Sequence, residues 1–545
     1  MRGKRERVVA ACMLSALTLG LSASCQQTKE ETQIDSVTFT FYNADGSEDP
    51  WSDPVAQAIT DATGVTIETQ YPTQGNEDCI ALMIATGEYP DLIFAKGDSN
   101  LLIENDALID MSDLIDEYGP HIKELYGDDY EKLRCSSEDD AIYQLCSTEV
   151  GNEILTTSGT AQLQWAVLAE NDYEIPRTLD AYTEMIRSYL EKYPTINGQK
   201  TIGISLSCAD WHWYITLSDP AGFIANGSVG DGQWVVDEDG TVHYKHCVEN
   251  QKEYFQWLNE MYAEAILDPE FATQTHEEYQ QKIMSGRVLA LLDSEWDYAD
   301  AEITLEKNGM SERTYAGLPV TLNEDVVCAT LRGQQLATGW GIGITKDCKD
   351  PVRAVQFLDW MCSEEAQILL NWGIEDVDYT YDDTGKRVNL NGDSGQSVED
   401  YREESGVGYH NYPVPAYGNT AKDSTGNYYK QQSREMVAEG YNSAERDALE
   451  AWGCEYLTDI FPQADEFEPL LYSPLWSKVL PSEIAATVTE LDALSAERLV
   501  DCIVCDPQEF EQEWESYQTQ LEELGVRQAE ACMTELIQKE IAENS

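Results

Sequence analysis

The sequence predicts an α/β fold with at least two lobes that face each other across a cleft. Strand-like and helix-like segments alternate along the chain, and this alternation occurs in two separate regions. The length of 545 residues exceeds that of one ordinary domain. The apolar fraction of 42% is typical of a globular protein, so we expect a substantial core.

The first lobe is predicted from residues 37–95. Val37, Phe39 and Phe41 alternate with threonines, which indicates a strand. A helix follows, with Asp53 as its cap and Gly64 at its end. The remaining elements are a strand at 65–69, a helix at 78–86 and a buried strand at 92–95. This order predicts a parallel sheet.

The second region repeats this style. Its predicted elements are a strand at 165–168, a helix from Thr178 to Pro194, a strand at 201–206, a hairpin around Asp239-Gly240, a long helix through 254–261, a buried strand within 285–298, a strand at 339–346 and a helix that starts at Asp350-Pro351. We expect the chain to cross between the lobes more than once. The expected division is 36–150 plus 285–345 for the first lobe, and 151–284 plus 346–545 for the second.

The N-terminus has the pattern of a secretory signal. Basic residues precede an apolar run, Val8–Leu21, which is shorter than the roughly 20 residues of a membrane-spanning helix. Ser22–Cys25 resembles the lipobox of bacterial lipoproteins, although Leu21 stands one position early. We therefore predict a signal peptide at 1–24, lipidation of Cys25 and a polar tether at 25–35. Ordinary cleavage nearby, which would release the protein, is the alternative.

The net charge of −67 and the pI near 4.1 exclude some partners. Such a surface repels phosphate backbones, so we expect no nucleic-acid binding. Neutral or cationic ligands fit better than polyanions, and the charge can also serve solubility alone. No second long apolar run follows the signal, so the mature chain should not span a membrane.

Cysteine and histidine spacing predicts no metal site and no cofactor. The fourteen cysteines show no disulfide framework, and both oxidised pairs and unbridged thiols remain open. Cys502 and Cys505 form the one close pair, whereas a zinc site of this kind needs two. His243 and His246 are three apart on a predicted strand, so they should point to opposite faces.

Ligands of open α/β sheets bind beyond the carboxyl ends of the strands. In the first lobe, these positions hold polar residues and one tryptophan close in sequence to the predicted strand ends. They are Asn43, Asp45, Trp51, Asp98 and Asn100.

Four stretches, taken in order, resemble the bacterial extracellular solute-binding proteins of carbohydrate ABC importers (family 1). They are "MIATGEYPDLIFA" with the segment 102–126 that follows it, then 263–291, 346–386 and 509–540. The resemblance implies a two-lobed, hinged fold like that of type II periplasmic binding proteins, with extra C-terminal helices. It also implies a monomeric lipoprotein on the extracytoplasmic face of the cell membrane, which captures a sugar or oligosaccharide for the transmembrane subunits of an ABC permease.

Some members of that family carry a calcium loop where this sequence reads "YPTINGQKTIG". Asn197 and Gly198 remain here, but the acidic ligands are missing. Calcium needs six to eight oxygen ligands, so we expect no calcium at this loop.

Sugars present apolar faces and rings of hydroxyls, which aromatic rings and fixed polar oxygens can cover. Further candidates therefore follow the second-lobe strands or lie in late loops. They are Asp210, Trp211, Trp213, Tyr214, Asp293, Trp296, Trp340, Tyr409 and Tyr412. His212 can donate to a ligand or merely fill space. Trp257 and Trp360 lie on helical stripes and are assigned to the core.

Three alternatives remain open beside a sugar importer. The protein could bind a peptide or another small polar solute, or present its ligand to a sensor kinase. It could also be a surface glycoside hydrolase, for which Asp293 and Glu295 form the most plausible acid pair. Since nothing marks a carboxyl group as catalytic, we predict no enzyme and no catalytic residues. No phosphate-binding loop appears, so another protein must supply the energy for transport.

Overall fold

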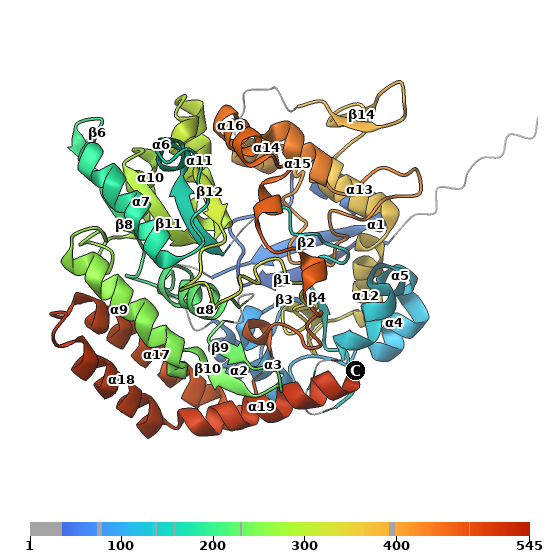
Figure 1. The fold of residues 1–545 in the computed structure, drawn as a ribbon. Helices are drawn as coiled ribbons and strands as arrows, with labels where there is room; N and C mark the ends of the chain where they lie inside the picture. The colour runs from blue at the N-terminus through green and yellow to red at the C-terminus, as the bar shows by residue number, and fades with distance from the viewer. Residues whose placement is uncertain are drawn as a thin grey trace, which may run out of the picture.

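Two β-sheets, each covered by helices on both faces, form the cores of two lobes (Figure 1). The computed structural model describes residues 35–72, 79–134, 136, 139–156, 159–228, 232–391, 398–478 and 480–544. The predicted signal peptide, Cys25 and most of the tether lie outside these residues.

The first sheet has five strands in the order β2-β1-β3-β13-β4. They are β1 (Val37–Asn43), β2 (Val65–Gln70), β3 (Leu92–Phe94), β4 (Gln144–Cys146) and β13 (Gly341–Ile344). β1 is parallel to both β2 and β3, as predicted, whereas β13 runs antiparallel to β3 and β4. The carboxyl ends of β1 and β3 therefore share an edge with the start of β13.

Helices cover both faces of this sheet. One face carries α1 (Pro54–Thr63), α4 (Ser112–Tyr118), α5 (Pro120–Tyr126), α12 (Pro351–Met361) and α13 (Glu364–Trp372). The other carries α2 (Cys79–Thr86) and α3 (Ser99–Glu104). The predicted ends of α1 are correct: the Asp53 side chain accepts a hydrogen bond from the Ala56 N–H, and Gly64 ends the helix at φ 72°.

The second sheet has the order β12-β5-β11-β8. Its strands are β5 (Thr160–Gln164), β8 (Ile202–Ser205), β11 (Val288–Asp293) and β12 (Tyr315–Leu318). β8 and β11 are parallel neighbours, while β5 runs antiparallel to β11 and β12.

One face of the second sheet packs against a large helical layer. Its helices are α6 (Trp165–Glu170), α7 (Leu179–Lys192), α8 (Asp219–Asn226), α9 (Glu249–Ala263), α16 (Ser443–Trp452), α17 (Ser482–Val504), α18 (Phe510–Leu524) and α19 (Val526–Glu543). In Figure 1, α17 and α18 lie along α9, and α19 passes β10 (Val242–Tyr244). Val526, Ala529, Met533 and Ile537 of α19 are fully buried in this core. The extra C-terminal helices are thus an integral part of the second lobe.

The opposite face of the second sheet is covered by α10 (His276–Met284) and α11 (Glu295–Lys307). Smaller elements complete the chain: the hairpins β6 (Thr195–Ile196)–β7 (Gln199–Lys200), β9 (Trp234–Val236)–β10 and β14 (Tyr379–Tyr381)–β15 (Arg387–Asn389), with α14 (Val398–Ser405) and α15 (Arg434–Gly440).

The expected division into lobes needs correction at two places. Residues 285–345 were expected in the first lobe, but β11 and β12 pair with β5 and β8 in the second sheet, and only β13 joins the first. The helices after residue 346 were expected in the second lobe, yet α12 and α13 pack against the first core. The chain passes between the lobes three times.

The strand expected at 165–168 is also wrong. Strand β5 ends at Gln164, and Trp165 begins α6, with Trp165, Val167 and Leu168 buried. A short run of consecutive apolar residues has no period, so it suits a buried strand and a buried helix equally well.

The described part of the chain contains eleven cysteines, and no disulfide joins any two of these eleven. Among the described residues, no helix has both the length and the apolar character needed to cross a bilayer.

Glu302 on α11 gives the stability of the second lobe a dependence on pH. Burial, with help from nearby acidic side chains such as Glu295, raises the pKa of its carboxyl to about 8. The folded protein therefore keeps this proton up to about pH 8, whereas the unfolded chain releases it at its ordinary pKa of about 4.3. Between these two pKa values the folded state binds one more proton than the unfolded chain. The free energy of unfolding therefore falls as the pH rises from about 5 to 8.

Replacing Glu302 with glutamine should remove this loss while the side-chain oxygen still accepts from the Tyr315 N–H. We expect Glu302→Gln to melt close to the wild type at pH 5 and at a higher temperature at pH 8, in thermal melts across this range. Glu191→Gln, at an exposed position of α7, is the control. If the melting temperatures of the wild type and Glu302→Gln changed with pH in the same way, the raised pKa of Glu302 would be contradicted.

Candidate functional site

The edge of the first sheet where β1 and β3 end gathers polar residues and an indole. Asn43 ends β1, and its side-chain oxygen accepts a hydrogen bond from the Asp45 N–H at 3.0 Å. Asp45 forms an ion pair with Lys96, which follows β3. Trp340 reaches the same edge because it precedes the antiparallel β13, and Lys96 Nζ lies 5.6 Å from its ring centre.

Two further aromatic rings adjoin this ion pair. The Tyr412 hydroxyl donates to Asp45 Oδ2 at 3.2 Å. Trp476, from the short helical turn η8 (Leu475–Ser477), meets the Trp340 ring edge-on at 4.9 Å. We call the following four residues the first-lobe aromatic group: Asp45, Lys96, Trp340 and Tyr412. Trp476 packs against this group from a turn whose Leu475 lies in the second-lobe core.

A cavity of about 230 Å³ lies between the loop after β1 and the late segment around residues 402–414. Five of the predicted residues line it: Asn43, Asp45, Trp51, Tyr409 and Tyr412. The Trp51 indole N–H donates to Thr60 Oγ1 at 3.0 Å, and its ring meets the His410 ring edge-on at 4.7 Å. The structure thus brings together predicted residues that lie more than 350 positions apart.

The other two predicted residues of the first lobe lie in and after the turn that follows β3. Asp98 is exposed in the turn η1 (Lys96–Asp98). Asn100 is buried in α3, so its amide is turned away from solvent.

In the second lobe, two exposed tryptophans follow neighbouring parallel strands. Trp211 follows β8 and is 56% exposed, while Trp296 follows β11 and is 59% exposed. Their rings are nearly parallel, at 8°, with centroids 6.1 Å apart. Asp210, also largely exposed, stands beside Trp211. We call Trp211 and Trp296 the tryptophan platform.

The next two predicted aromatics are half-buried in the second lobe. Trp213 packs against the second-lobe core, and Tyr214 begins a short π-helix, η3 (Tyr214–Ser218). A Cβ on Gly232 would lie 2.3 Å from the Tyr214 hydroxyl oxygen and 2.9 Å from Trp476 Cβ, and its φ is +65°. Glycine is required here because Tyr214 and Trp476 both approach its backbone. Trp476 therefore connects the first-lobe aromatic group to the second lobe.

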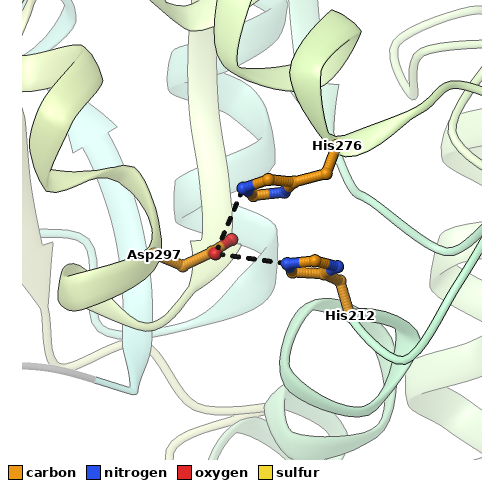
Figure 2. A group of neighbouring side chains, drawn as sticks. All are labelled: His212, His276 and Asp297. Carbon is orange, nitrogen blue, oxygen red and sulfur yellow. Dashed lines mark ion pairs between the residues drawn. The ribbon is translucent and has the colours of Figure 1, made fainter. Parts of the chain in front are cut away.

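Behind the tryptophan platform lies a pair of histidines with one carboxylate, shown in Figure 2. The His212 ring stacks on Trp211 at 4.0 Å and on the His276 ring at 3.9 Å. His212 Nε2 and His276 Nε2 each lie 3.5 Å from Asp297 Oδ1. Burial lowers the pKa of His276, which favours its neutral form.

Asp293 lies at the end of β11, as expected, but the structure buries it. Its side chain is 1% exposed and accepts a hydrogen bond from the Tyr279 hydroxyl at 2.8 Å. Burial and the neighbouring Asp297 carboxylate raise its pKa well above the usual range. A ligand in solvent cannot touch this carboxyl, so Asp293 supports its neighbours rather than contacting a ligand. It also cannot act with Glu295 as an exposed hydrolytic pair.

His243 and His246 have separate surroundings, but strand alternation is not the reason, because β10 ends at Tyr244 and His246 lies in a short 3-10 turn (Lys245–Cys247). His243 pairs with Asp237 at 2.9 Å on a half-exposed hairpin. His246 is fully buried beside Ser218 Oγ, and burial lowers its pKa well below the usual range.

Sequence reasoning missed Lys96, Trp476, His276 and Asp297. Lys96 and Asp297 adjoin predicted residues, so their place at a strand end was a usable signal. Trp476 and His276 come from distant segments and reach the site only through tertiary packing.

Comparison with known proteins gives a family and a fold. The model of the family described as bacterial extracellular solute-binding protein matches residues 55–371. Lipoprotein LipO of Bacillus subtilis (strain 168) is 23% identical over 352 residues, which cover 61% of this chain and 64% of LipO. The fructooligosaccharide ABC transporter substrate-binding protein FusA of Streptococcus pneumoniae serotype 4 is 26% identical over 235 residues, which cover 41% of this chain and 43% of FusA. The match spans less than two thirds of either relative.

A solved structure resembles nearly the whole chain. It is the EF-hand mutant of S. pneumoniae FusA in complex with fructo-nystose, with a TM-score of 0.68 and 19% identity, covering 93% of this chain and 100% of that one. This likeness confirms the predicted two-lobed α/β fold.

Proposed function

Because the chain belongs to the bacterial extracellular solute-binding protein family, as its four characteristic stretches predicted, we propose that it captures an oligosaccharide between its lobes for an ABC importer. The family consists of binding proteins, which agrees with the prediction that this chain is not an enzyme. We further propose that it acts as a monomer on the extracytoplasmic face of the cell membrane, held there by a lipid on Cys25. Its partners would be the transmembrane subunits of the importer.

The tryptophan platform carries this proposal. Two large, parallel indole faces at strand ends remain more than half exposed, although burying each would be favourable. Aromatic faces suit the apolar faces of sugar rings, and the oxygens of Asp210 beside them can accept hydrogen bonds from hydroxyls. The relative FusA, named for fructooligosaccharides, makes short oligosaccharides the first ligands to test.

The first-lobe aromatic group supplies the opposite wall in this proposal. Tyr412 is 44% exposed and donates to Asp45 of the Asp45–Lys96 ion pair. Trp476 is 38% exposed and packs against Trp340, whose ring lies near Lys96. Aromatic rings beside a few fixed polar groups are what a saccharide pocket needs. Closure of the lobes would bring this wall toward the tryptophan platform.

A ligand panel tests the proposal directly. The chain without its first 25 residues is melted with fructooligosaccharides, other oligosaccharides, peptides and amino acids, and hits are titrated by calorimetry. A ligand present at about 100 times its dissociation constant adds about 2.7 kcal/mol of stability, which a thermal melt resolves. We expect saturable binding of one saccharide per chain without product release.

Other outcomes point to the alternatives. A shift with peptides alone would favour a peptide binder, and release of shorter sugars would favour a hydrolase. Saccharide binding without rescue of sugar uptake in a deletion strain would favour presentation to a sensor kinase.

The proposed lipid anchor predicts where the protein fractionates. With wild-type Cys25, we expect the protein in the membrane fraction, because more than one acyl chain gives lasting attachment. Cys25→Ser should move it to the medium, as measured by immunoblotting of both fractions. Cys348→Ser, a change to a half-buried thiol of the described chain, should leave it membrane-bound. Equal release of the wild type and Cys25→Ser would contradict the anchor.

A further inference from the structure

The side chains of His212, His276 and Asp297 bring three electron-pair donor atoms within 4.8 Å of one another (Figure 2). His212 comes from the loop after β8, His276 is the first residue of α10, and Asp297 lies in the first turn of α11. Each histidine Nε2 lies 3.5 Å from Asp297 Oδ1, which is longer than a hydrogen bond of 2.7–3.2 Å. The contacts are therefore close without being hydrogen bonds.

The other contacts of these rings indicate that both Nε2 atoms carry lone pairs. His212 Nδ1 lies 2.5 Å from Asp210 Oδ1, so the proton of a neutral ring resides on Nδ1 and leaves Nε2 free. The Gln280 amide nitrogen lies 3.3 Å from His276 Nε2 and donates to it. The lone pair of His212 Nε2 is therefore free, whereas that of His276 Nε2 accepts the long hydrogen bond from Gln280, which a cation between the three atoms would displace.

We infer that His212, His276 and Asp297 bind one divalent transition-metal ion of the Zn²⁺ class. Tetrahedral zinc has bonds of about 2.0–2.2 Å to nitrogen and oxygen, which place its ligand atoms roughly 3.3–3.5 Å apart. The observed distance of 3.5 Å from each histidine Nε2 to Asp297 Oδ1 matches this spacing between ligand atoms. Two imidazoles and one carboxylate favour Zn²⁺ over Ca²⁺ or Mg²⁺, which prefer oxygen ligands.

The surroundings of the cluster support such a site. The Asp297 side chain is 4% exposed and lies beside the buried Asp293 carboxyl. The Asp210 carboxylate holds His212 through Nδ1, as carboxylates behind zinc-bound histidines commonly do. The two rings are within 9° of parallel, so one ion cannot lie in both ring planes. His276, whose Nδ1 has no partner among the described residues, is the ring that turns on binding.

This inference does not depend on the proposed saccharide function, because metal binding is measured without sugar. The metal-free protein is titrated with Zn²⁺, Ca²⁺ and Mg²⁺ by calorimetry, and Co²⁺ replaces Zn²⁺ for visible absorption spectroscopy. We expect one Zn²⁺ per chain with a micromolar or lower dissociation constant, and no Ca²⁺ or Mg²⁺ binding in that range. His276→Phe keeps an aromatic ring in the stack but removes the nitrogen, so its dissociation constant for Zn²⁺ should rise at least tenfold.

Asp297→Asn provides a second variant, and thermal melts of both metal-free variants establish that they fold. His410→Ala tests the other group that could hold a metal, Asp49, Asp53 and His410, and Cys502→Ser tests the close thiol pair. Both controls should bind Zn²⁺ as the wild type does. Absence of Zn²⁺ binding, wild-type binding by folded His276→Phe and Asp297→Asn, or loss of binding in either control would overturn the inference.

Discussion

Replacing Trp211 or Trp296 with alanine is expected to weaken saccharide binding by about 30-fold each, with little effect on folding. Each indole is expected to bury roughly 80 Å² against a ligand, which at about 25 cal/mol per Å² is worth about 2 kcal/mol. A difference of 1.4 kcal/mol is tenfold in affinity, so 2 kcal/mol is about 30-fold. Because both side chains are more than half exposed in the free protein, their removal leaves little cavity behind.

Calorimetric titration with a saccharide identified by the panel measures this effect, and thermal melts of the free variants measure stability. Trp360→Ala is the matched control, because Trp360 on α12 packs against the first-lobe core. This variant should lose stability and keep its affinity for the saccharide. Unchanged affinity in both platform variants would remove these residues from the binding site. A large loss of stability in either one would mean that its indole belongs to the core instead.

Replacing Arg387 with methionine is expected to destabilise the protein by about 3 kcal/mol. Arg387 is 1% exposed, and its Nη2 lies 2.5 Å from Asp423 Oδ2. Its guanidinium also lies 5.2 Å from the Tyr379 ring centre and 5.3 Å from that of Trp372. Removing one partner of a buried ion pair leaves the other charge uncompensated, which commonly costs 3–5 kcal/mol.

Chemical denaturation of four proteins isolates this effect: wild type, Arg387→Met, Asp423→Asn and the double variant. The double variant should regain part of the stability that Arg387→Met loses, because no buried carboxylate then lacks a cation. Lys192→Met breaks the exposed pair with Glu170 and should produce no resolvable change. If Arg387→Met and Lys192→Met behaved alike, the pair between Arg387 and Asp423 would not be a significant source of stability.

The sequence predicted well those elements whose signals are local. The alternation at 37–41 and the Asp53 and Gly64 signals predicted β1 and α1 because these patterns need no information about distant residues. The strand at 165–168 failed because five consecutive apolar residues of α6 carry no period.

The division into lobes was less predictable because strand pairing is non-local. β11 lies between β5 and β8, and no feature within residues 288–293 determines which sheet this strand joins. The same limit applied to the candidate site. Position after a strand identified Trp211 and Trp296, but burial of Asp293 and the approach of His276 and Trp476 arise from packing between distant segments.

The buried stripe of α19 bears on the order in which the protein can mature during translation. A nascent chain emerges from its N-terminus, and contiguous domains can fold as they appear. Here the second core needs Met533 and Ile537, which lie far along the chain from β5 of the same core. That core can therefore close only after α19 has emerged, and deleting α19 would expose it to solvent.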